Sequence, residues 1–387
     1  MDDLKNGFER CLKILKDNEG LVGNKALKQI SLLLTLKLIP PNTKDIFMKG
    51  KSFDIKNPVN FEKLENILKS IDLSNINYDI LGKLYEQVFT IKELKGLGQF
   101  FTLPLIKNIM VKMVKPKLHL DGKIETICDL AMGTAGLLIT YLHNILEQAA
   151  TQNIKPDWDF IKKDGIYGKE LNPDTYDLAI SNLLISSGHI FNNLDCGNSI
   201  YEPITKKFDI VLANPPFGVD IKYDDFDYPL KKEFLPIKTN NSISLFLQMI
   251  IKILNINGRC AIVLPDGKDL FSKTKMFVAV RKYLMKCCDL KEILILPAGI
   301  FTNTKIRTCI FYFVKKQEGT DVFESDSHQT SKVKFYDYNP YNDDKNLLIE
   351  VPIDKIANNS YSLNYTEYIE NKQYKEGFIM KTLGDMC

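Results

Sequence analysis

Apolar positions in the first 90 residues recur with the spacing of amphipathic helices. One such stripe is formed by Leu27, Ile30, Leu34 and Leu38. Turn-rich breaks at residues 40–42 and 56–58 separate the stripes into segments of helical length. The pattern predicts a small helical N-terminal domain over residues 1–95, in which the stripes form a core or, as the alternative, a surface for a partner.

Beyond Pro116, short apolar runs alternate with helical stretches. This alternation predicts an α/β fold with a doubly wound, mostly parallel sheet, in a domain over residues 96–318. The expected strands occupy residues 126–130, 164–170, 208–213, 259–264, 292–296 and 308–314. Because the last two runs lie too close together for a crossover helix, we expect them to end the sheet antiparallel. Residues 319–387 follow as a predicted linker and C-terminal tail, with a strand-like run at residues 333–338 and the alternative that a specificity region starts here.

The composition is that of an ordinary globular protein, with 45% hydrophobic and 26% charged residues among 387. A net charge of +3 gives no general signal for nucleic-acid binding. Basic residues are concentrated locally, with five lysines in residues 98–123 and seven lysines and arginines in residues 266–291. Such stretches flank phosphate-binding clefts, but they are also typical of solvated helix faces.

Eight cysteines without a CxxC pair, and four dispersed histidines, fit neither a disulfide framework nor a zinc site. The N-terminus lacks the basic region of a signal peptide, and Lys28 and Lys37 interrupt the most apolar early run. We therefore expect a soluble, cytoplasmic protein that holds no metal and does not contact a membrane.

The apolar run at residues 208–213 ends abruptly in Asn214-Pro215-Pro216-Phe217. Two prolines cannot continue a β ladder, so the chain leaves the sheet at the edge where α/β proteins bind ligands. The side-chain oxygen of Asn214 and the carbonyl of Pro215 can each accept a hydrogen bond from an exocyclic amine. Phe217 can stack on a planar ring. Alone, the turn is equally typical of a rigid Pro-Pro loop.

Three other strand ends carry residues that suit a nucleoside cofactor. The turn after the first strand contains Asp129, Gly133, Thr134 and Gly136. Its glycines admit close approach of the backbone to a ligand, at the start of a helix. Glu170 ends the second strand, where an acid can accept both hydroxyls of a ribose. Asn198 lies before the next strand, where it suits the amino edge of adenine or, alternatively, a polar turn.

Taken in order, these segments resemble the modification subunits of type I restriction–modification systems, which are DNA methyltransferases acting on adenine N6. The matching segments span roughly residues 12–314. They include Gly98-Gln99-Phe100-Phe101-Thr102, Asp129 with residues 133–136, residues 169–173, residues 214–218, residues 263–267 and residues 296–301. The chain departs from the family at Leu103 and Leu130, where the family commonly has proline. Neither change removes a polar contact.

The resemblance implies a Rossmann-like methyltransferase domain that uses S-adenosylmethionine. The implied cofactor-binding residues are Gln99, Phe101, Thr102, Asp129, Gly133, Thr134, Gly136, Glu170 and Asn198. Thr102 and Asp129 would hold the methionine end of the cofactor, Glu170 its ribose, and Asn198 its adenine. The implied catalytic residues are Asn214, Pro215 and Phe217, which would hold the target N6 and stack on the flipped base.

The resemblance also implies the partners: duplex DNA, a specificity subunit that selects the site, and a restriction subunit. Residues 361–365 and 380–387 resemble the join at which a specificity domain begins in fused relatives, so we expect that region to be split off, truncated or encoded separately. Residues 218–241 are expected to form a mobile flap beside the Asn-Pro-Pro-Phe turn. Two alternatives stay open: methyl transfer to RNA or protein glutamine, and a non-enzymatic assembly subunit that retains the fold.

Overall fold

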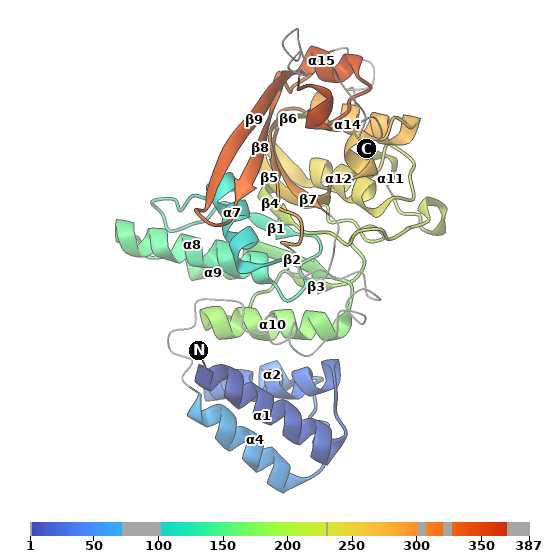
Figure 1. The fold of residues 1–387 in the computed structure, drawn as a ribbon. Helices are drawn as coiled ribbons and strands as arrows, with labels where there is room; N and C mark the ends of the chain where they lie inside the picture. The colour runs from blue at the N-terminus through green and yellow to red at the C-terminus, as the bar shows by residue number, and fades with distance from the viewer. Residues whose placement is uncertain (1, 72–101, 230, 301–306, 320–326, 370–387) are drawn as a thin grey trace, which may run out of the picture.

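The computed structural model describes residues 2–71, 102–229, 231–300, 307–319 and 327–369. Its N-terminal part consists of the helices α1 (Asp2–Glu19), α2 (Asn24–Leu38), α3 (Pro41–Met48) and α4 (Pro58–Ser70). The predicted stripe of α2 is buried at Leu27, Ile30 and Leu34, so it serves as core at these positions. The same apolar cluster contains Leu178 of α10 (Pro173–Ser187), which seats the helices on the rest of the molecule (Figure 1).

The remainder is a nine-stranded sheet in the order β3-β2-β1-β4-β5-β7-β6-β8-β9. Its strands are β1 (Ile127–Asp129), β2 (Ile166–Glu170), β3 (Leu194–Cys196), β4 (Phe208–Ala213), β5 (Leu254–Pro265), β6 (Cys288–Ile295), β7 (Thr308–Lys315), β8 (Lys332–Asn339) and β9 (Asp344–Pro352). Pairing is parallel from β3 through β5 and between β6 and β8. The predicted fold class, α/β with a mostly parallel sheet, is confirmed.

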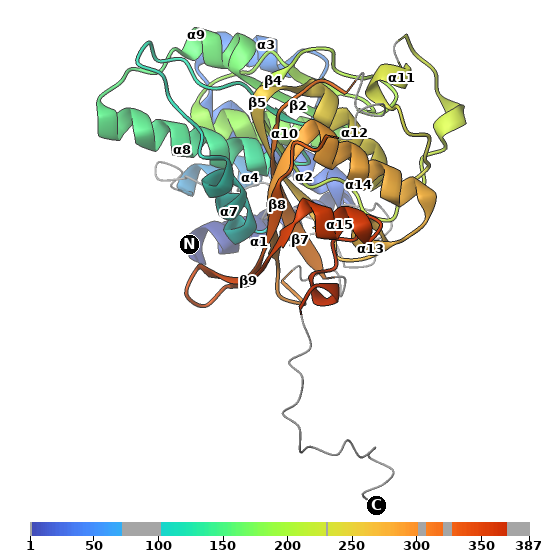
Figure 2. The same cartoon turned by 90° about the horizontal axis from the view of Figure 1, so that it is seen from above.

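Helices cover both faces of the sheet. On one side lie α7 (Pro104–Val114) and α8 (Gly136–Gln152), and on the other α12 (Ser242–Ile253) and α14 (Lys275–Cys287), as Figure 2 shows. Shorter helical segments are α9 (Trp158–Phe160), η1 (Ile161–Gly165), η2 (Tyr223–Asp225), α11 (Lys231–Phe234), α13 (Lys268–Phe271), α15 (Ile353–Asn358) and η3 (Tyr365–Glu367).

The sheet extends further than the sequence pattern predicts. As expected, β6 and β7 pair antiparallel, with β7 inserted between β5 and β6. They do not end the sheet, because β8 adds to β6 and β9 adds to β8. The strand predicted at residues 333–338 corresponds to β8, and the chain after residue 318 contributes β9 in addition. Neither β3 nor β9 is among the predicted runs, because β3 has three residues and β9 is mostly exposed along its length.

The strand order creates the position for a ligand. From β1 the chain continues to β2 and β3 on one side, and then crosses to β4 and β5 on the other. The carboxyl ends of β1 and β4 therefore lie side by side at a topological switch point, where doubly wound sheets form a crevice.

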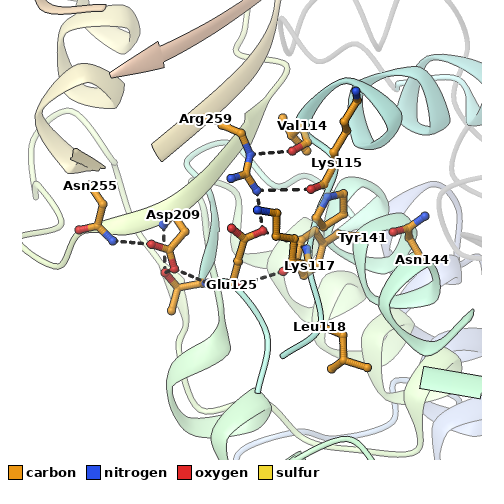
Figure 3. A network of polar contacts seen from close by, with 12 residues as sticks. Val114, Lys115, Lys117, Leu118, Glu125, Tyr141, Asn144, Asp209, Asn255 and Arg259 are labelled. Carbon is orange, nitrogen blue, oxygen red and sulfur yellow. Dashed lines mark hydrogen bonds and ion pairs between the residues drawn. The ribbon is translucent and has the colours of Figure 1, made fainter. Parts of the chain in front are cut away.

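At the end of the sheet opposite to the carboxyl ends of β1 and β4, a polar network fixes α7 to the sheet (Figure 3). Arg259 of β5 donates from Nε to the Val114 carbonyl over 2.7 Å and from Nη2 to Glu125 over 2.5 Å. Next to it, the carboxylate of Asp209 accepts hydrogen bonds from Thr126 and, over 2.8 Å, from Asn255. The C-terminal end of α7 is thereby tied to β5 through charge-assisted bonds, which are stronger than neutral ones.

We predict that Arg259→Met destabilises the fold by about 1–3 kcal/mol, because it removes the charged donor of the Glu125 carboxylate, which keeps the Lys117 N–H, and the donor of the Val114 carbonyl. The control is Lys332→Met, which removes an exposed ion pair with Glu350 and should change stability by less than about 1 kcal/mol. Urea unfolding of both variants measures the difference. Equal losses in the two variants would contradict a special role for Arg259.

Candidate active site

A cavity of about 370 Å³ opens at the carboxyl ends of β1, β2 and β4. The residues predicted from sequence that line it are Thr102, Asp129, Gly133, Thr134, Gly136, Glu170, Asn198 and Asn214. Pro215 and Phe217 are not among the lining residues, whereas Pro216 is. Gln99 and Phe101 lie outside the described residues. Residues that are up to 112 positions apart in the sequence thus share one cavity.

The turn between β1 and α8 is held from both sides. Oε2 of Glu170 accepts a hydrogen bond from the Gly133 N–H over 3.1 Å, and its Oε1 accepts from the Asn172 N–H over 2.8 Å. Gly133 has φ of 55°, a left-handed conformation that favours glycine. On the α10 side, Asn182 donates to the Thr134 carbonyl over 2.8 Å. Glu170 therefore supports the backbone that would meet a ligand.

Two of the acids that line the cavity, Asp129 and Glu170, are buried and hold their protons more tightly than usual. Burial raises the pKa of Asp129 to about 7, although the Ala131 N–H, 3.0 Å from Oδ1, favours the charged form. Burial likewise raises the pKa of Glu170, opposed by the N–H groups of Asn172 and Gly133. Near neutral pH, Asp129 is thus poised between its two protonation states, and a cationic ligand would favour the carboxylate.

The loop after β3 packs closely on this turn. Ser199 donates to the Leu130 carbonyl over 2.6 Å, and Lys169 binds the carboxylate of Glu202 over 2.9 Å. Gly197 lies directly against this ion pair, since an added Cβ would stand 2.4 Å from Oε2 of Glu202. Sequence reasoning missed these contacts, because each joins residues that are 33 or more positions apart.

Asn198 lies at the cavity and forms a polar turn there. It lines the cavity, and its Oδ1 also accepts hydrogen bonds from the N–H groups of Ile200 and Tyr201, at 2.9 and 3.3 Å. The oxygen therefore caps its own turn, as the polar-turn interpretation expects. The amide nitrogen is the end better suited to a ligand, and it donates rather than accepts.

The Asn-Pro-Pro-Phe turn is fixed by contacts from two distant segments. Nδ2 of Asn214 donates to Oγ1 of Thr102 over 3.0 Å, which orients the amide. Oγ of the buried Ser242, at the start of α12, donates to the Pro216 carbonyl over 3.0 Å. Phe217 is only 8% exposed and packs in the apolar core. In this arrangement its ring does not face the cavity.

Residues 218–241 are folded onto the cavity wall. The Ile221 N–H donates to the Asn240 carbonyl over 2.8 Å. Nζ of Lys231 lies 4.0 Å from the ring centre of Tyr223 and 4.4 Å from that of Phe226. Phe226 stacks in turn on Tyr201, a cavity residue, with ring centres 4.6 Å apart. These contacts hold the described part of the segment against the cavity wall, and its motion stays a prediction.

The basic stretch at residues 266–291 contains structural side chains. Arg281 is 2% exposed and donates to the carbonyls of Tyr361, Ser272 and Asp269. It thereby joins the segment after α15 to the loop around α13. Lys286 is 1% exposed as well. Neither residue can belong to a solvated face or contact a phosphate at the surface, so any basic DNA-facing surface here depends on the exposed lysines.

A model of the N-6 DNA methylase family matches residues 76–377. The chain belongs to this family. The resemblance to type I modification subunits that the motifs carry is confirmed. The match includes every predicted cofactor-binding and catalytic residue within its bounds, from Gln99 to Phe217.

Two relatives of this chain are named methylase subunits of type I restriction enzymes. It is 30% identical to the type I restriction enzyme EcoEI methylase subunit of Escherichia coli, over 83% of this chain and 66% of that protein. It is 33% identical to the StySJI methylase subunit of Salmonella typhimurium, over 68% of this chain and 50% of that protein. The chain thus spans between half and two thirds of the length of these relatives.

A solved chain from work on complex assembly and conformational transition of the type I R-M system has the same fold. It is 17% identical, with a TM-score of 0.67, and the likeness covers 100% of this chain and 94% of that chain. At this identity, the likeness shows the fold alone.

Within the described ranges, no group of three or more His, Cys, Asp or Glu side chains is arranged to hold a metal ion. In that same part of the chain, no helix has the length and apolar character needed to cross a membrane.

We predict that the free energy of unfolding falls as the pH rises from about 4, the usual value for an aspartate, to about 7. An acid with a raised folded-state pKa binds its proton more tightly in the folded protein, so ionisation destabilises the fold, by at most about 1.4 kcal/mol per pH unit. Asp129→Asn should remove the part of this pH dependence that is due to Asp129 and leave the part that is due to Glu170. Urea unfolding at several pH values across this range measures how the free energy of unfolding depends on pH. With Asp337→Asn, at an exposed position of β8, the slope should persist; an unchanged slope in Asp129→Asn would contradict the assignment.

Proposed function

We propose that this chain is the catalytic subunit of an adenine-N6 DNA methyltransferase that uses S-adenosylmethionine. The observation that carries the proposal is the hydrogen bond between Thr102 and Asn214, inside a cavity that also contains Asp129 and Glu170. It couples the side expected to hold the cofactor to the turn expected to hold the acceptor. A cavity of about 370 Å³ lies within the usual range for small-molecule sites, roughly 300–1,000 Å³.

The residues present fit the proposed cofactor. S-adenosylmethionine carries an ammonium and a sulfonium, and the two buried acids would ionise more readily beside such cations. Glu170, at the end of β2, is placed to accept hydrogen bonds from ribose hydroxyls, while its backbone bonds keep the carboxylate in position. Asn198 would donate from its amide to a ring nitrogen of adenine, since its oxygen is used by the turn.

When bound, S-adenosylmethionine would supply an activated methyl group on its sulfonium. Asn214 Oδ1 and the Pro215 carbonyl would accept hydrogen bonds from adenine N6, whose lone pair is otherwise delocalised into the ring. Two acceptors bias N6 toward a nucleophilic geometry and hold it in line with the methyl group. Thr102 orients Asn214, and Ser242 steadies the turn through Pro216. The base must leave the duplex to reach these groups.

Stacking of Phe217 on the base requires a further step. Because the ring is buried in the core, the turn must open as the base enters. The segment 218–241, which follows the turn and rests on Tyr201 through Phe226, would move with it. Base entry and rearrangement of the segment are therefore coupled in this proposal.

The proposed partners are inferred from the named relatives of this chain and not from the cavity. Relatives of this chain are named methylase subunits of type I restriction enzymes, so we extend to it a specificity subunit, duplex DNA and a restriction subunit as partners. A DNA substrate also favours an intracellular, cytoplasmic location. The named relatives do not favour RNA or protein glutamine as the acceptor.

We predict that Asn214→Ala lowers methyl transfer to adenine by about 100-fold or more, because one of the two groups that hold N6 is lost. The assay follows radiolabelled methyl incorporation into diverse duplex DNA with a matching specificity subunit supplied. Asn346→Ala, at an exposed position of β9, is the control and should retain the activity. Absence of label in adenine with the unmodified chain would reject the proposed function.

A further inference from the structure

The second part of the segment 218–241 is fixed to α12 by side chains of that helix. Gln248 of α12 is fully buried, and its amide binds both backbone groups of Ile237. Its Oε1 accepts from the Ile237 N–H over 2.7 Å, and its Nε2 donates to the Ile237 carbonyl over 3.1 Å. Lys252 of α12 also binds Glu233 of α11 over 2.9 Å. A displacement of this part would break buried hydrogen bonds, so we expect it to stay in place.

The residues that the segment contributes to the cavity are fixed as well. Val219, Asp220 and Ile221 line the cavity. The Ser242 N–H donates to the Val219 carbonyl over 3.3 Å, and Asp220 pairs with Asn241 in an isolated β-bridge. This wall of the cavity therefore belongs to the base of the segment, where its two ends meet at the start of α12.

Residues 224–229, which we call the tip, reach the cavity through a stack of aromatic rings. Phe226 stacks on Tyr201 with ring centres 4.6 Å apart, and Tyr228 stacks on Phe226 at 6.1 Å. Tyr201 lines the cavity and is 37% exposed, so it lies at the mouth. Its ring is thus braced from outside the cavity by a side chain of the tip.

Lys231, the first residue of α11, joins the tip to the fixed parts of the segment. Its Nζ donates to the carbonyl of Tyr223 over 2.6 Å and to that of Phe226 over 2.5 Å. The same ammonium lies close to the rings of both residues, so it holds the backbone and the ring of Phe226 together. A second link, between Lys238 and Asp224, is an exposed ion pair and contributes little.

Tyr228 opposes this attachment. Its hydroxyl is buried and has no hydrogen-bond partner among the described residues. A hydroxyl that is removed from water without a replacement bond costs free energy, and it regains those bonds when the tip moves into solvent. The docked position of the tip is therefore a balance, in which Lys231 favours docking and the Tyr228 hydroxyl favours release.

We propose that Lys231 is a positioning residue that controls the exchange of the ligand in the cavity. Acting through Phe226, it keeps the ring of Tyr201 at the mouth, and release of the tip frees this ring to turn aside. The base of the segment and its cavity wall stay fixed during this step. The inference rests on the proposed function for the identity of the ligand, and it names the part of segment 218–241 that rearranges.

The first test measures the tip directly, in the full chain without a ligand. An endoproteinase that cuts before aspartate is used, because the tip contains Asp224, Asp225 and Asp227. Lys231→Met, which removes the donors, should speed cleavage at the tip by about 10-fold. Tyr228→Phe should slow it by about threefold, because the hydroxyl without a partner is gone. Fragments identified by mass spectrometry give both rates.

Two further variants show whether the effect belongs to the Lys231 side chain. Lys231→Arg keeps the charge and the donors, and it should restore most of the protection of the tip. Lys232→Met changes the next residue, which is exposed, and should leave cleavage at the rate of the unmodified chain. A rise in cleavage throughout the chain in Lys231→Met would indicate general destabilisation and would overturn the role of Lys231.

The second test measures the dissociation rate constant of S-adenosylmethionine by stopped-flow displacement. The constant should rise by about 10-fold in Lys231→Met and fall by about threefold in Tyr228→Phe, because the two changes shift the docking of the tip in opposite directions. A residue that only stabilises the fold would not produce this pair of opposite effects. Lys231→Arg should behave like the unmodified chain.

The outcomes separate this inference from the proposed function. Unchanged cleavage of the tip in Lys231→Met, or faster cleavage with an unchanged dissociation rate constant, would overturn the inference while leaving S-adenosylmethionine as the cofactor. Failure of the unmodified chain to bind S-adenosylmethionine would overturn the proposed function and the exchange step with it. If Lys231→Met does not fold, as seen by circular dichroism, Lys231→Gln replaces it with the same expected results.

Discussion

The carboxylate of Glu170 is the contact on which the functional edge of this sheet depends. It ends β2, and through its two oxygens it fixes the backbone of the β1 turn at Gly133 and the start of α10 at Asn172. An unpaired carboxylate in such a buried position would cost several kcal/mol, whereas one that accepts N–H bonds is tolerated. The same group that orders three elements is thus available to a ligand at their junction.

This arrangement gives the site an unusual electrostatic state. Two acids share a region of low solvent access, and burial raises the pKa of both. A ligand that brings positive charge would offset the penalty that burial imposes on these carboxylates. Proton release should accompany binding, since the acids ionise as the cation approaches. The burial that organises the edge also tunes its preference for a cation.

The sequence predicted the residues at the cavity better than the side chains that hold the surrounding turns in place. Asp129, Glu170 and Asn214 follow apolar runs that read as strands, and parallel strands place their carboxyl ends at one edge. Ser242 and Asn182 carry no such local signal, because their partners lie 26 and 48 residues away. Their roles follow only from the packing of α10 and α12 against the turns.

The same limit explains two further features of the structure. The stacking role predicted for Phe217 stays a prediction, and the structure adds that the ring is buried in the apolar core, a position that depends on neighbours distant in sequence. The strand β9 escaped prediction because it lies at the edge of the sheet and exposes most of its residues, so it lacks the alternation that marks a half-buried strand.

The site is completed by a segment that precedes the sheet. Thr102 and α7 come before β1 in the chain, yet Thr102 binds Asn214 after β4, and α7 is held by Arg259 of β5. The segment before β1 is therefore joined to the sheet region twice, once inside the cavity through Asn214 and once through Arg259 of β5. A displacement of α7 would move Thr102 as well. A shift of Thr102 would change the orientation of Asn214, so the proposed function requires α7 and the residues before it to stay in place.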